Sequence, residues 1–190
     1  DTKGLLITSI EDDDPVIFFE PKRLYNGPFD GDHKKAALKW DTHPKGEVPE
    51  EEYLLPIGVA DIKRSGSDVT VVSFGKIIKE AYKAADSLEK EGISIEIIDL
   101  RTVCPLDIKT VINSVKKTNR LVILEEAWPF GNVSTEITYQ VQEKAFDYLD
   151  APVIKINTAD TPAPYSPVLL QEWLPNSGDV IKAVKKVLYK

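Results

Sequence analysis

From Val59 to the end of the chain, short apolar runs alternate with segments whose apolar residues recur every three or four positions. The runs predict strands at residues 69–74, 93–100, 121–124 and 153–156, and Val59–Lys63 predicts an additional antiparallel edge strand. The segments that follow predict helices with apolar stripes starting at Ile77, Ile108, Val133 and Val180. Continuous apolar strands joined by helices are typical of a mainly parallel sheet covered on both faces. The predicted fold class is therefore a doubly wound α/β fold.

The first 56 residues do not follow this alternation. Residues 5–10 predict the end of a helix, residues 11–15 an acidic turn, and Val16–Phe19 a short apolar strand. Because a lone strand cannot satisfy its backbone groups, we expect it to belong to a domain upstream of Asp1. Residues 26–56 are rich in Gly, Pro and charge, which indicates an interdomain crossing. The expected division is a tail of the upstream domain (1–25), the crossing (26–56), whose candidate anchors are Phe29, Trp40 and Tyr53, and the α/β domain (57–190).

Composition excludes several classes of function. The net charge is −7, and Lys and Arg are scattered among Asp and Glu, so we expect no nucleic-acid partner. No apolar run reaches the roughly 20 residues that span a bilayer, and the acidic start does not resemble a signal peptide. We therefore expect no membrane partner. Cys104 has no second cysteine to pair with and is expected to be a packed structural thiol. The absence of Met indicates that the front of the chain was removed.

Polar residues gather where the predicted strands end. In open parallel sheets, ligands and partners bind beyond the carboxyl ends of the strands, which makes four segments candidates: Gly75, Asp99–Thr102, Glu125–Asn132 and Asp160–Tyr165. In the second segment we favour a local ion-pair network over ligand contact, and Arg101 is the best single cation for an anionic group. Both interpretations of Arg101 stay open at this point.

These segments do not supply a catalytic set. Glu125 and Glu126 are adjacent, and adjacent side chains near a strand point to opposite faces, so they would not share one substrate. Trp128 and Phe130 supply apolar area that suits an interface anchor and a core plug equally well. Neither histidine has a second ligand at metal-binding spacing, and no glycine-rich phosphate motif follows a strand.

Four segments together resemble the beta subunit of the thiamine-diphosphate-dependent 2-oxo acid dehydrogenases: Pro15–Tyr25, Asp99–Asp107, Glu125–Gly131 and Ala159–Tyr165. The resemblance covers essentially the whole chain. It implies a transketolase C-terminal fold for the α/β domain, and a pyrimidine-binding domain for which residues 1–25 form the tail. The Trp-Pro-Phe-Gly sequence and the Pro-Tyr ending resemble the pyruvate enzyme more than the branched-chain enzyme. A branched-chain dehydrogenase and a transketolase stay as alternatives.

The resemblance also implies the chemistry of the parent enzyme. Such an enzyme decarboxylates pyruvate on thiamine diphosphate and magnesium and transfers the acetyl group to the lipoyl groups of an acyltransferase. The family's catalytic glutamate and histidine lie upstream, so the resemblance implies no catalytic or cofactor-binding residue here and an inactive isolated fragment. The implied partners are an alpha subunit and a second beta subunit of a heterotetramer, and the peripheral subunit-binding domain of the acyltransferase. The implied location is the cytoplasm, or the mitochondrial matrix in a eukaryote.

One set of residues inherits a role from the resemblance, and a second set is chosen by its position and chemistry at the strand ends. The family's potassium site corresponds to Ser9, Ile10, Asp12 and Asp14, the first two through their backbone carbonyls. The candidate interface residues are Arg101, Trp128, Phe130 and Tyr165. Without the family, the alternative is a self-sufficient domain that binds a small anion at Arg101.

Overall fold

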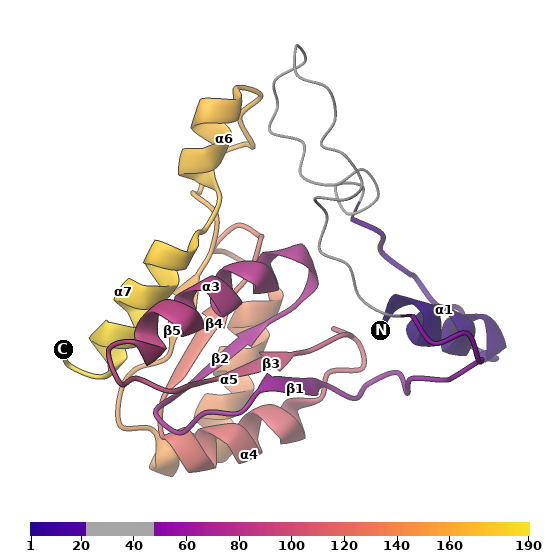
Figure 1. The fold of residues 1–190 in the computed structure, drawn as a ribbon, viewed down its shortest axis with the longest axis horizontal. Helices are drawn as coiled ribbons and strands as arrows, with labels where there is room; N and C mark the ends of the chain where they lie inside the picture. The colour runs from indigo at the N-terminus through magenta and orange to yellow at the C-terminus, as the bar shows by residue number, and fades with distance from the viewer. Residues whose placement is uncertain (22–47) are drawn as a thin grey trace. The chain divides into compact units, whose positions relative to one another are not determined.

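The computed structural model describes residues 1–21 and 48–190, and the chain divides into two compact units, Asp1–Ile57 and Gly58–Lys190. The second unit contains a sheet in the order β1-β3-β2-β4-β5 (Figure 1). Its strands are β1 (Asp61–Arg64), β2 (Val69–Ser73), β3 (Ile95–Asp99), β4 (Leu121–Leu124) and β5 (Ile154–Ile156). β1 pairs antiparallel with β3, and the other pairs are parallel. The predicted fold class and the antiparallel edge strand are confirmed.

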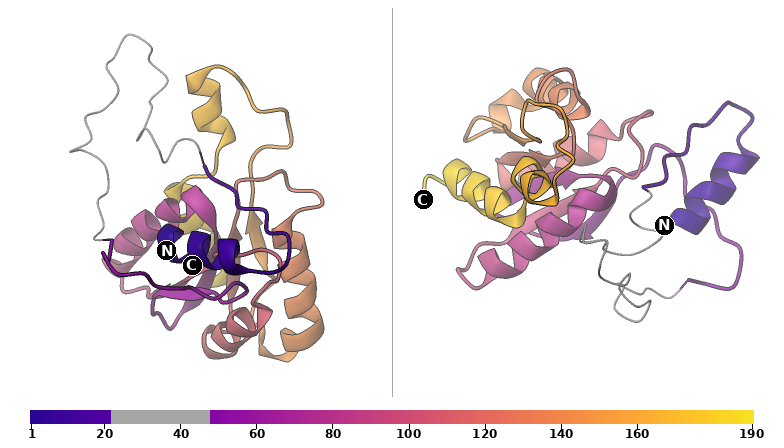
Figure 2. Two further views of the ribbon diagram at one scale, coloured as in Figure 1. Left: turned by 90° about the vertical axis from the view of Figure 1, so that its right-hand side faces the viewer. Right: turned by 90° about the horizontal axis from the view of Figure 1, so that it is seen from above.

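Helices cover both faces of this sheet. The helices of this unit are η2 (Gly75–Ile77), α3 (Ile78–Glu89), α4 (Ile108–Thr118), α5 (Val133–Ala145), η3 (Phe146–Tyr148), α6 (Pro167–Trp173) and α7 (Ser177–Val187). α3 and α7 pack together on one face, and α4 and α5 pack together on the other, as Figures 1 and 2 show from three sides. α6 was not predicted from the sequence.

The core consists of two apolar layers, one on each face of the sheet. Because successive strand residues point to opposite faces, Val71 joins the layer under α3 and α7 while Val72 joins the layer under α4 and α5. Ile97 and Ile98 of β3 divide in the same way. Every residue of the central strand β2 is buried, as expected for a parallel strand covered on both sides.

The order of the strands fixes where a site can form. From β2 the chain passes through α3 to β3 on one side, and then through α4 to β4 on the other side of β2. The carboxyl ends of β2 and β4 therefore flank the point at which the winding reverses, where open sheets usually bind ligands. There the Ser73 hydroxyl donates to the Leu124 carbonyl at 2.9 Å, which ties the two strands together.

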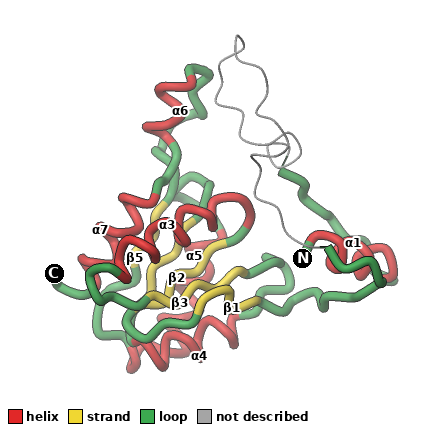
Figure 3. Tube along the Cα trace, viewed as in Figure 1, coloured by secondary structure: helices red, strands yellow, loops and turns green. Residues whose placement is uncertain are grey.

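The first unit contains α1 (Thr2–Glu11) and no strand among its described residues. Val16–Phe19, predicted as a strand of an upstream domain, form a loop in this structure (Figure 3), and the first unit contains no described strand that could pair with them. Tyr53 packs against α1, where a Cβ on Gly4 would lie 2.5 Å from its ring. The other residues predicted in the crossing, Phe29, His33, Trp40 and His43, lie outside the described residues.

A smaller difference concerns a single position. Cys104 is exposed rather than packed, because it lies in the loop between β3 and α4, outside the covered faces of the sheet. Among the described residues, no helix is long and apolar enough to cross a membrane.

Candidate functional site

The loop after β3 directs its charges toward its own domain. β1 places Asp61 opposite Asp99, and the Arg101 guanidinium forms an ion pair with Asp61 at 2.7 Å. The Arg101 backbone N–H donates to Asp99 at 3.0 Å, and Lys63 contacts Asp61 at 2.6 Å. Burial raises the pKa of Asp99; burial acts the same way on Asp61, but the hydrogen bond and charges of Lys63 and Arg101 outweigh it and lower its pKa. The ion-pair interpretation of Arg101 is confirmed, with Asp61 as the partner that sequence reasoning missed.

The rest of that loop holds the segment that leads into β1. The Thr102 hydroxyl accepts a hydrogen bond from the Gly58 N–H at 3.0 Å. Asp107 accepts from the Ala60 N–H at 3.0 Å and caps α4 through the Thr110 N–H at 3.1 Å. Burial opposes the effect, but the hydrogen bonds from Thr110 and Ala60 lower the pKa of Asp107. The polar residues of this motif therefore stabilise the local fold.

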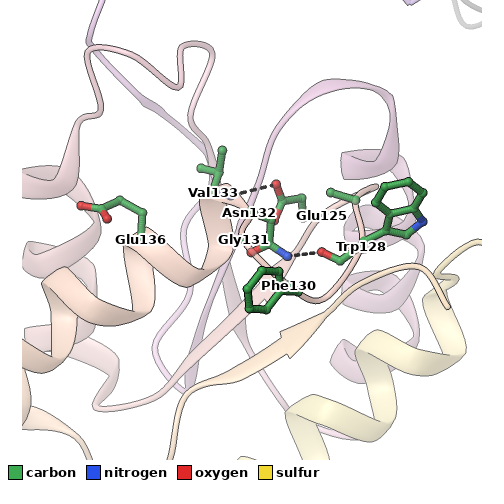
Figure 4. A pocket seen from close by; sticks show the side chains of 8 residues that line it. Glu125, Trp128, Phe130, Gly131, Asn132, Val133 and Glu136 are labelled. Atoms are coloured by element: carbon green, nitrogen blue, oxygen red, sulfur yellow. Dashed lines mark hydrogen bonds between the residues drawn. The ribbon is translucent and has the colours of Figure 1, made fainter. Parts of the chain in front are cut away.

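At the end of β4, Glu125 occupies the amino end of α5. Its side chain is buried, and its two oxygens accept hydrogen bonds, one from the Val133 N–H at 3.2 Å (Figure 4) and one from the Ser134 N–H at 3.0 Å. The first N–H groups of a helix attract anions, and here an internal carboxylate satisfies them. Glu126 is exposed, so the two adjacent carboxylates point apart, as predicted, and do not form an acid and base pair.

The loop between β4 and α5 is held along its length. The Asn132 side chain caps α5 by accepting from the Thr135 N–H at 2.9 Å, and it donates to the Trp128 carbonyl. From β5, the Lys155 ammonium donates to the Pro129 carbonyl at 2.9 Å and to the Thr135 hydroxyl at 2.7 Å. These bonds fix the backbone on which Trp128 and Phe130 are presented.

A second segment, residues 157–173, is bound to this loop by its backbone and by the Trp128 indole. The Thr158 N–H donates to the Ala127 carbonyl at 3.0 Å. The indole N–H groups of Trp128 and Trp173 both donate to the Thr161 carbonyl at 2.9 Å. One carbonyl thus joins the loop after β4 to the end of α6.

Large apolar side chains nevertheless remain exposed on these two segments. The exposed fractions are 54% for Trp128, 90% for Phe130 and 97% for Tyr165, and Val168 and Leu169 of α6 are also exposed. We name these five residues the carboxyl-edge apolar surface. Next to it lies an open pocket of about 460 Å³ lined by Glu125, Trp128, Phe130 and Glu136, among others (Figure 4). The core-plug interpretation of Phe130 is wrong, because its ring does not enter the core.

The predicted interface residues therefore separate into two groups. Trp128, Phe130 and Tyr165 lie on the two joined segments, whereas Arg101 lies in the loop after β3 and pairs with Asp61. Sequence reasoning missed Trp173 and α6. Pro167 at the first helical position, followed by Val168 and further apolar residues, is the signal that could have revealed this helix.

The four residues predicted to bind potassium lie in one turn at the end of α1. The last intrahelical bond runs from the Asp12 N–H to the Thr8 carbonyl, so the carbonyls of Ser9 and Ile10 lie beyond it. The Asp14 N–H donates to the Asp12 carboxylate at 2.9 Å. Such oxygens suit a hard cation. In the part of the chain that the structure describes, no three His, Cys, Asp or Glu side chains form a metal-binding group. The potassium site stays a prediction.

Comparison with known proteins identifies a family and several relatives. The transketolase C-terminal domain family matches residues 58–180. The beta subunit of 2-oxoisovalerate dehydrogenase from Pseudomonas aeruginosa is 45% identical over 190 residues, which cover 99% of this chain and 52% of that protein. The beta subunit of the pyruvate dehydrogenase E1 component from Rhizobium meliloti is 48% identical over 191 residues, which cover 100% of this chain and 38% of that protein. The chain thus spans about half the length of these relatives or less.

One solved structure is similar in fold. It is described as a split gene transketolase, an inactive beta4 tetramer, and it matches with a TM-score of 0.67 and 27% sequence identity. The match covers 77% of this chain and 46% of that one.

Proposed function

The chain belongs to the transketolase C-terminal domain family, among the beta subunits of the 2-oxo acid dehydrogenases, and we propose that it is the part of such a subunit that assembles the enzyme. The observation that carries this proposal is the carboxyl-edge apolar surface. At the edge where open α/β sheets usually bind a small ligand, the Glu125 carboxylate accepts hydrogen bonds from the first N–H groups of α5. Beside it, three aromatic rings are exposed on segments that hydrogen bonds hold in place. Rigid aromatic area with a polar surround is typical of protein interfaces.

For the parent enzyme we propose oxidative decarboxylation of pyruvate, with transfer of the acetyl group to the lipoyl groups of an acyltransferase. The Trp128-Pro129-Phe130-Gly131 sequence and the Pro164-Tyr165 ending support pyruvate over branched-chain substrates. Overall identity does not discriminate, because the pyruvate and 2-oxoisovalerate relatives are 48% and 45% identical. In this proposal, thiamine diphosphate and magnesium bind to other parts of the assembled enzyme, in the cytoplasm or in the mitochondrial matrix of a eukaryote.

The proposed partners are an alpha subunit, a second beta subunit and the peripheral subunit-binding domain of the acyltransferase. The split gene transketolase supports the idea that a related beta chain assembles without being active by itself. We further propose that residues 1–25 complete a pyrimidine-binding domain and that the turn at Ser9, Ile10, Asp12 and Asp14 binds potassium there. Replacing potassium by lithium should then lower the melting temperature of the full beta subunit, and Asp12→Asn should remove that difference.

The assembly proposal is tested by reconstitution. The full beta subunit that carries this sequence is combined with its alpha subunit, and decarboxylation of pyruvate and of 2-oxoisovalerate is measured. We expect a heterotetramer that prefers pyruvate. A preference for 2-oxoisovalerate would replace pyruvate as the substrate, and the absence of any complex would overturn the assembly role.

The non-catalytic role of the 190-residue chain has a separate test. Calorimetry with thiamine diphosphate and magnesium should show no binding to this chain alone. Micromolar binding would contradict the proposal that the cofactor is held elsewhere.

A further inference from the structure

The carboxyl-edge apolar surface lies in a part of the chain whose charges are all of one sign. Residues 125–136 and 157–176 contain five acidic residues, three in the first segment and two in the second, and no Lys or Arg. These 32 residues therefore carry −5 of the chain's net charge of −7. The rest of the chain is nearly balanced.

Four of the five carboxylates are exposed: Glu126, Glu136, Asp160 and Glu172. Each is close in sequence to a group that anchors the surface. Glu126 precedes Ala127, whose carbonyl joins the two segments, and Asp160 precedes Thr161, which accepts both indoles. Glu136 lines the same pocket as Trp128 and Phe130. We call these four exposed carboxylates, which lie on the same two segments as the exposed aromatic rings, the acidic rim.

Lys155, a base from β5 that contacts this loop, forms no ion pair with the four exposed carboxylates in the described part of the chain. The Lys155 ammonium is directed at the Pro129 carbonyl and the Thr135 hydroxyl, where it supports the loop backbone. An acidic rim around apolar area attracts a partner of opposite charge and repels one of the same sign.

We propose that the carboxyl-edge apolar surface docks a segment of another protein in which apolar side chains are flanked by lysine or arginine. This inference rests on the proposed assembly function only in treating this edge as an interface. The apolar side chains of the segment would contact Phe130, Tyr165 and α6, and its cations would pair with the four exposed carboxylates. The hydrogen bonds that hold Trp128 in place reduce the entropy lost on docking.

The same charge pattern disfavours two other occupants. A second copy that docked through this face by two-fold symmetry would bring the acidic rim against itself. An anionic lipid surface would be repelled for the same reason. A basic and apolar protein segment satisfies both the aromatic area and the carboxylates.

The experiment uses the 190-residue chain, labelled with nitrogen-15, and three synthetic peptides of about 16 residues. The first alternates leucine and phenylalanine with lysine, the second replaces its lysines by glutamate, and the third replaces its apolar residues by serine. Binding is followed through amide and indole signals at low and at physiological salt. We expect the first peptide to bind at least about tenfold more tightly than the other two, and its affinity to fall with salt. The shifted signals should include the Trp128 indole, Phe130 and Tyr165.

Matched charge reversals locate the effect. Glu126→Lys with Asp160→Lys should lower the affinity for the basic peptide about tenfold and raise that for the acidic peptide. Glu143→Lys with Asp147→Lys makes the same charge change at exposed positions near the carboxyl end of α5, at the opposite edge of the sheet, and should change neither affinity.

Three results would overturn the inference: equal binding of the basic and acidic peptides, shifts confined to residues outside the two segments, or a dimer formed through Phe130 and Tyr165 in sedimentation experiments. The peptide assay needs no alpha subunit and no substrate. If the peptides fail to bind as expected but the reconstituted enzyme is active, only the proposed chemistry of the partner is rejected. If the basic peptide binds but no complex forms with the alpha subunit, only the assembly role is rejected.

Discussion

Two loops at the same edge of the sheet use similar residue types in opposite ways. The loop after β3, residues 100–107, is rich in polar groups, and its Arg101, Thr102 and Asp107 bind other parts of the domain. The loop after β4, residues 125–132, buries one carboxylate and exposes its aromatic rings. The charged residues of a motif at a strand end can therefore all contact other parts of the same domain. The surface available to a partner is the one whose side chains have no role in the core.

The position of each strand in the sheet explains the difference. β3 lies next to the edge strand β1, so its loop meets the incoming backbone at Gly58 and Ala60, whose N–H groups need acceptors. β4 lies on the other side of β2, and its loop faces α5 and the segment before α6. In the loop after β3, side chains accept hydrogen bonds from backbone N–H groups. The loop after β4 is held mainly through its own backbone carbonyls, which accept hydrogen bonds.

The largest expected effect tests the buried member of the loop after β4. Glu125→Ala removes the acceptor for two N–H groups at the buried start of α5, and we expect the free energy of unfolding to fall by about 3 kcal/mol. Chemical denaturation followed by circular dichroism measures it. Glu125→Gln keeps one acceptor oxygen and should cost about half as much. Equal stability of Glu125→Ala and wild type would mean that this loop is not anchored through α5.

The next effect tests the loop after β3. Asp107→Ala removes the cap of α4 and the acceptor for Ala60, and we expect a loss of about 2 kcal/mol at neutral pH. The Thr110→Val variant, which keeps the Asp107 carboxylate, is the control and should cost less.

The contribution of Asp107 to stability also has a defined pH dependence. The pKa of Asp107 is lower in the folded state than in the unfolded chain, so its ionised form contributes stability above the ordinary aspartate pKa of about 3.9. That contribution is lost as the pH falls through the lowered folded pKa. The stability difference between wild type and Asp107→Asn should therefore shrink from pH 6 toward about pH 3. A constant difference would show that the carboxylate's charge is not what stabilises the cap.

A smaller effect distinguishes an ion pair from a ligand site at Arg101. The Arg101 and Asp61 side chains are partly accessible to solvent, so a double-mutant cycle with Arg101→Gln and Asp61→Asn should give a coupling free energy of about 0.5–1 kcal/mol. Added phosphate should leave the melting temperature of the wild type unchanged. Stabilisation by phosphate that disappears in Arg101→Gln would restore the small-anion hypothesis.

The sequence predicted the fold well because the apolar periods of strands and helices are local signals. The strands from Val69 to Ile156 and the stripes that begin at Ile77 and Ile108 follow from such patterns. Val16–Phe19 form a loop in this structure because apolar residues form a strand only where a neighbouring strand supplies hydrogen bonds.

The candidate site was predictable only in part. Position at strand ends identified Trp128, Phe130 and Tyr165 as candidates, but the partners that decide their roles are distant in sequence. Asp61 lies 40 residues from Arg101, and the Thr161 carbonyl lies 33 residues from Trp128. Such contacts depend on the order of the strands, which a residue pattern does not contain.

The smallest expected effect on stability concerns the two most exposed rings of the carboxyl-edge apolar surface. Phe130→Ser and Tyr165→Ser remove rings that are 90% and 97% exposed, so the free energy of unfolding should change by no more than about 0.5 kcal/mol. The same substitutions should abolish binding of the basic apolar peptide, because the rings supply the apolar contact area. Differential scanning fluorimetry and the peptide titration, run on the same samples, measure both quantities. Destabilisation by about 2 kcal/mol or more would instead make these rings part of the folded core, and the two loops would then no longer differ in the way described.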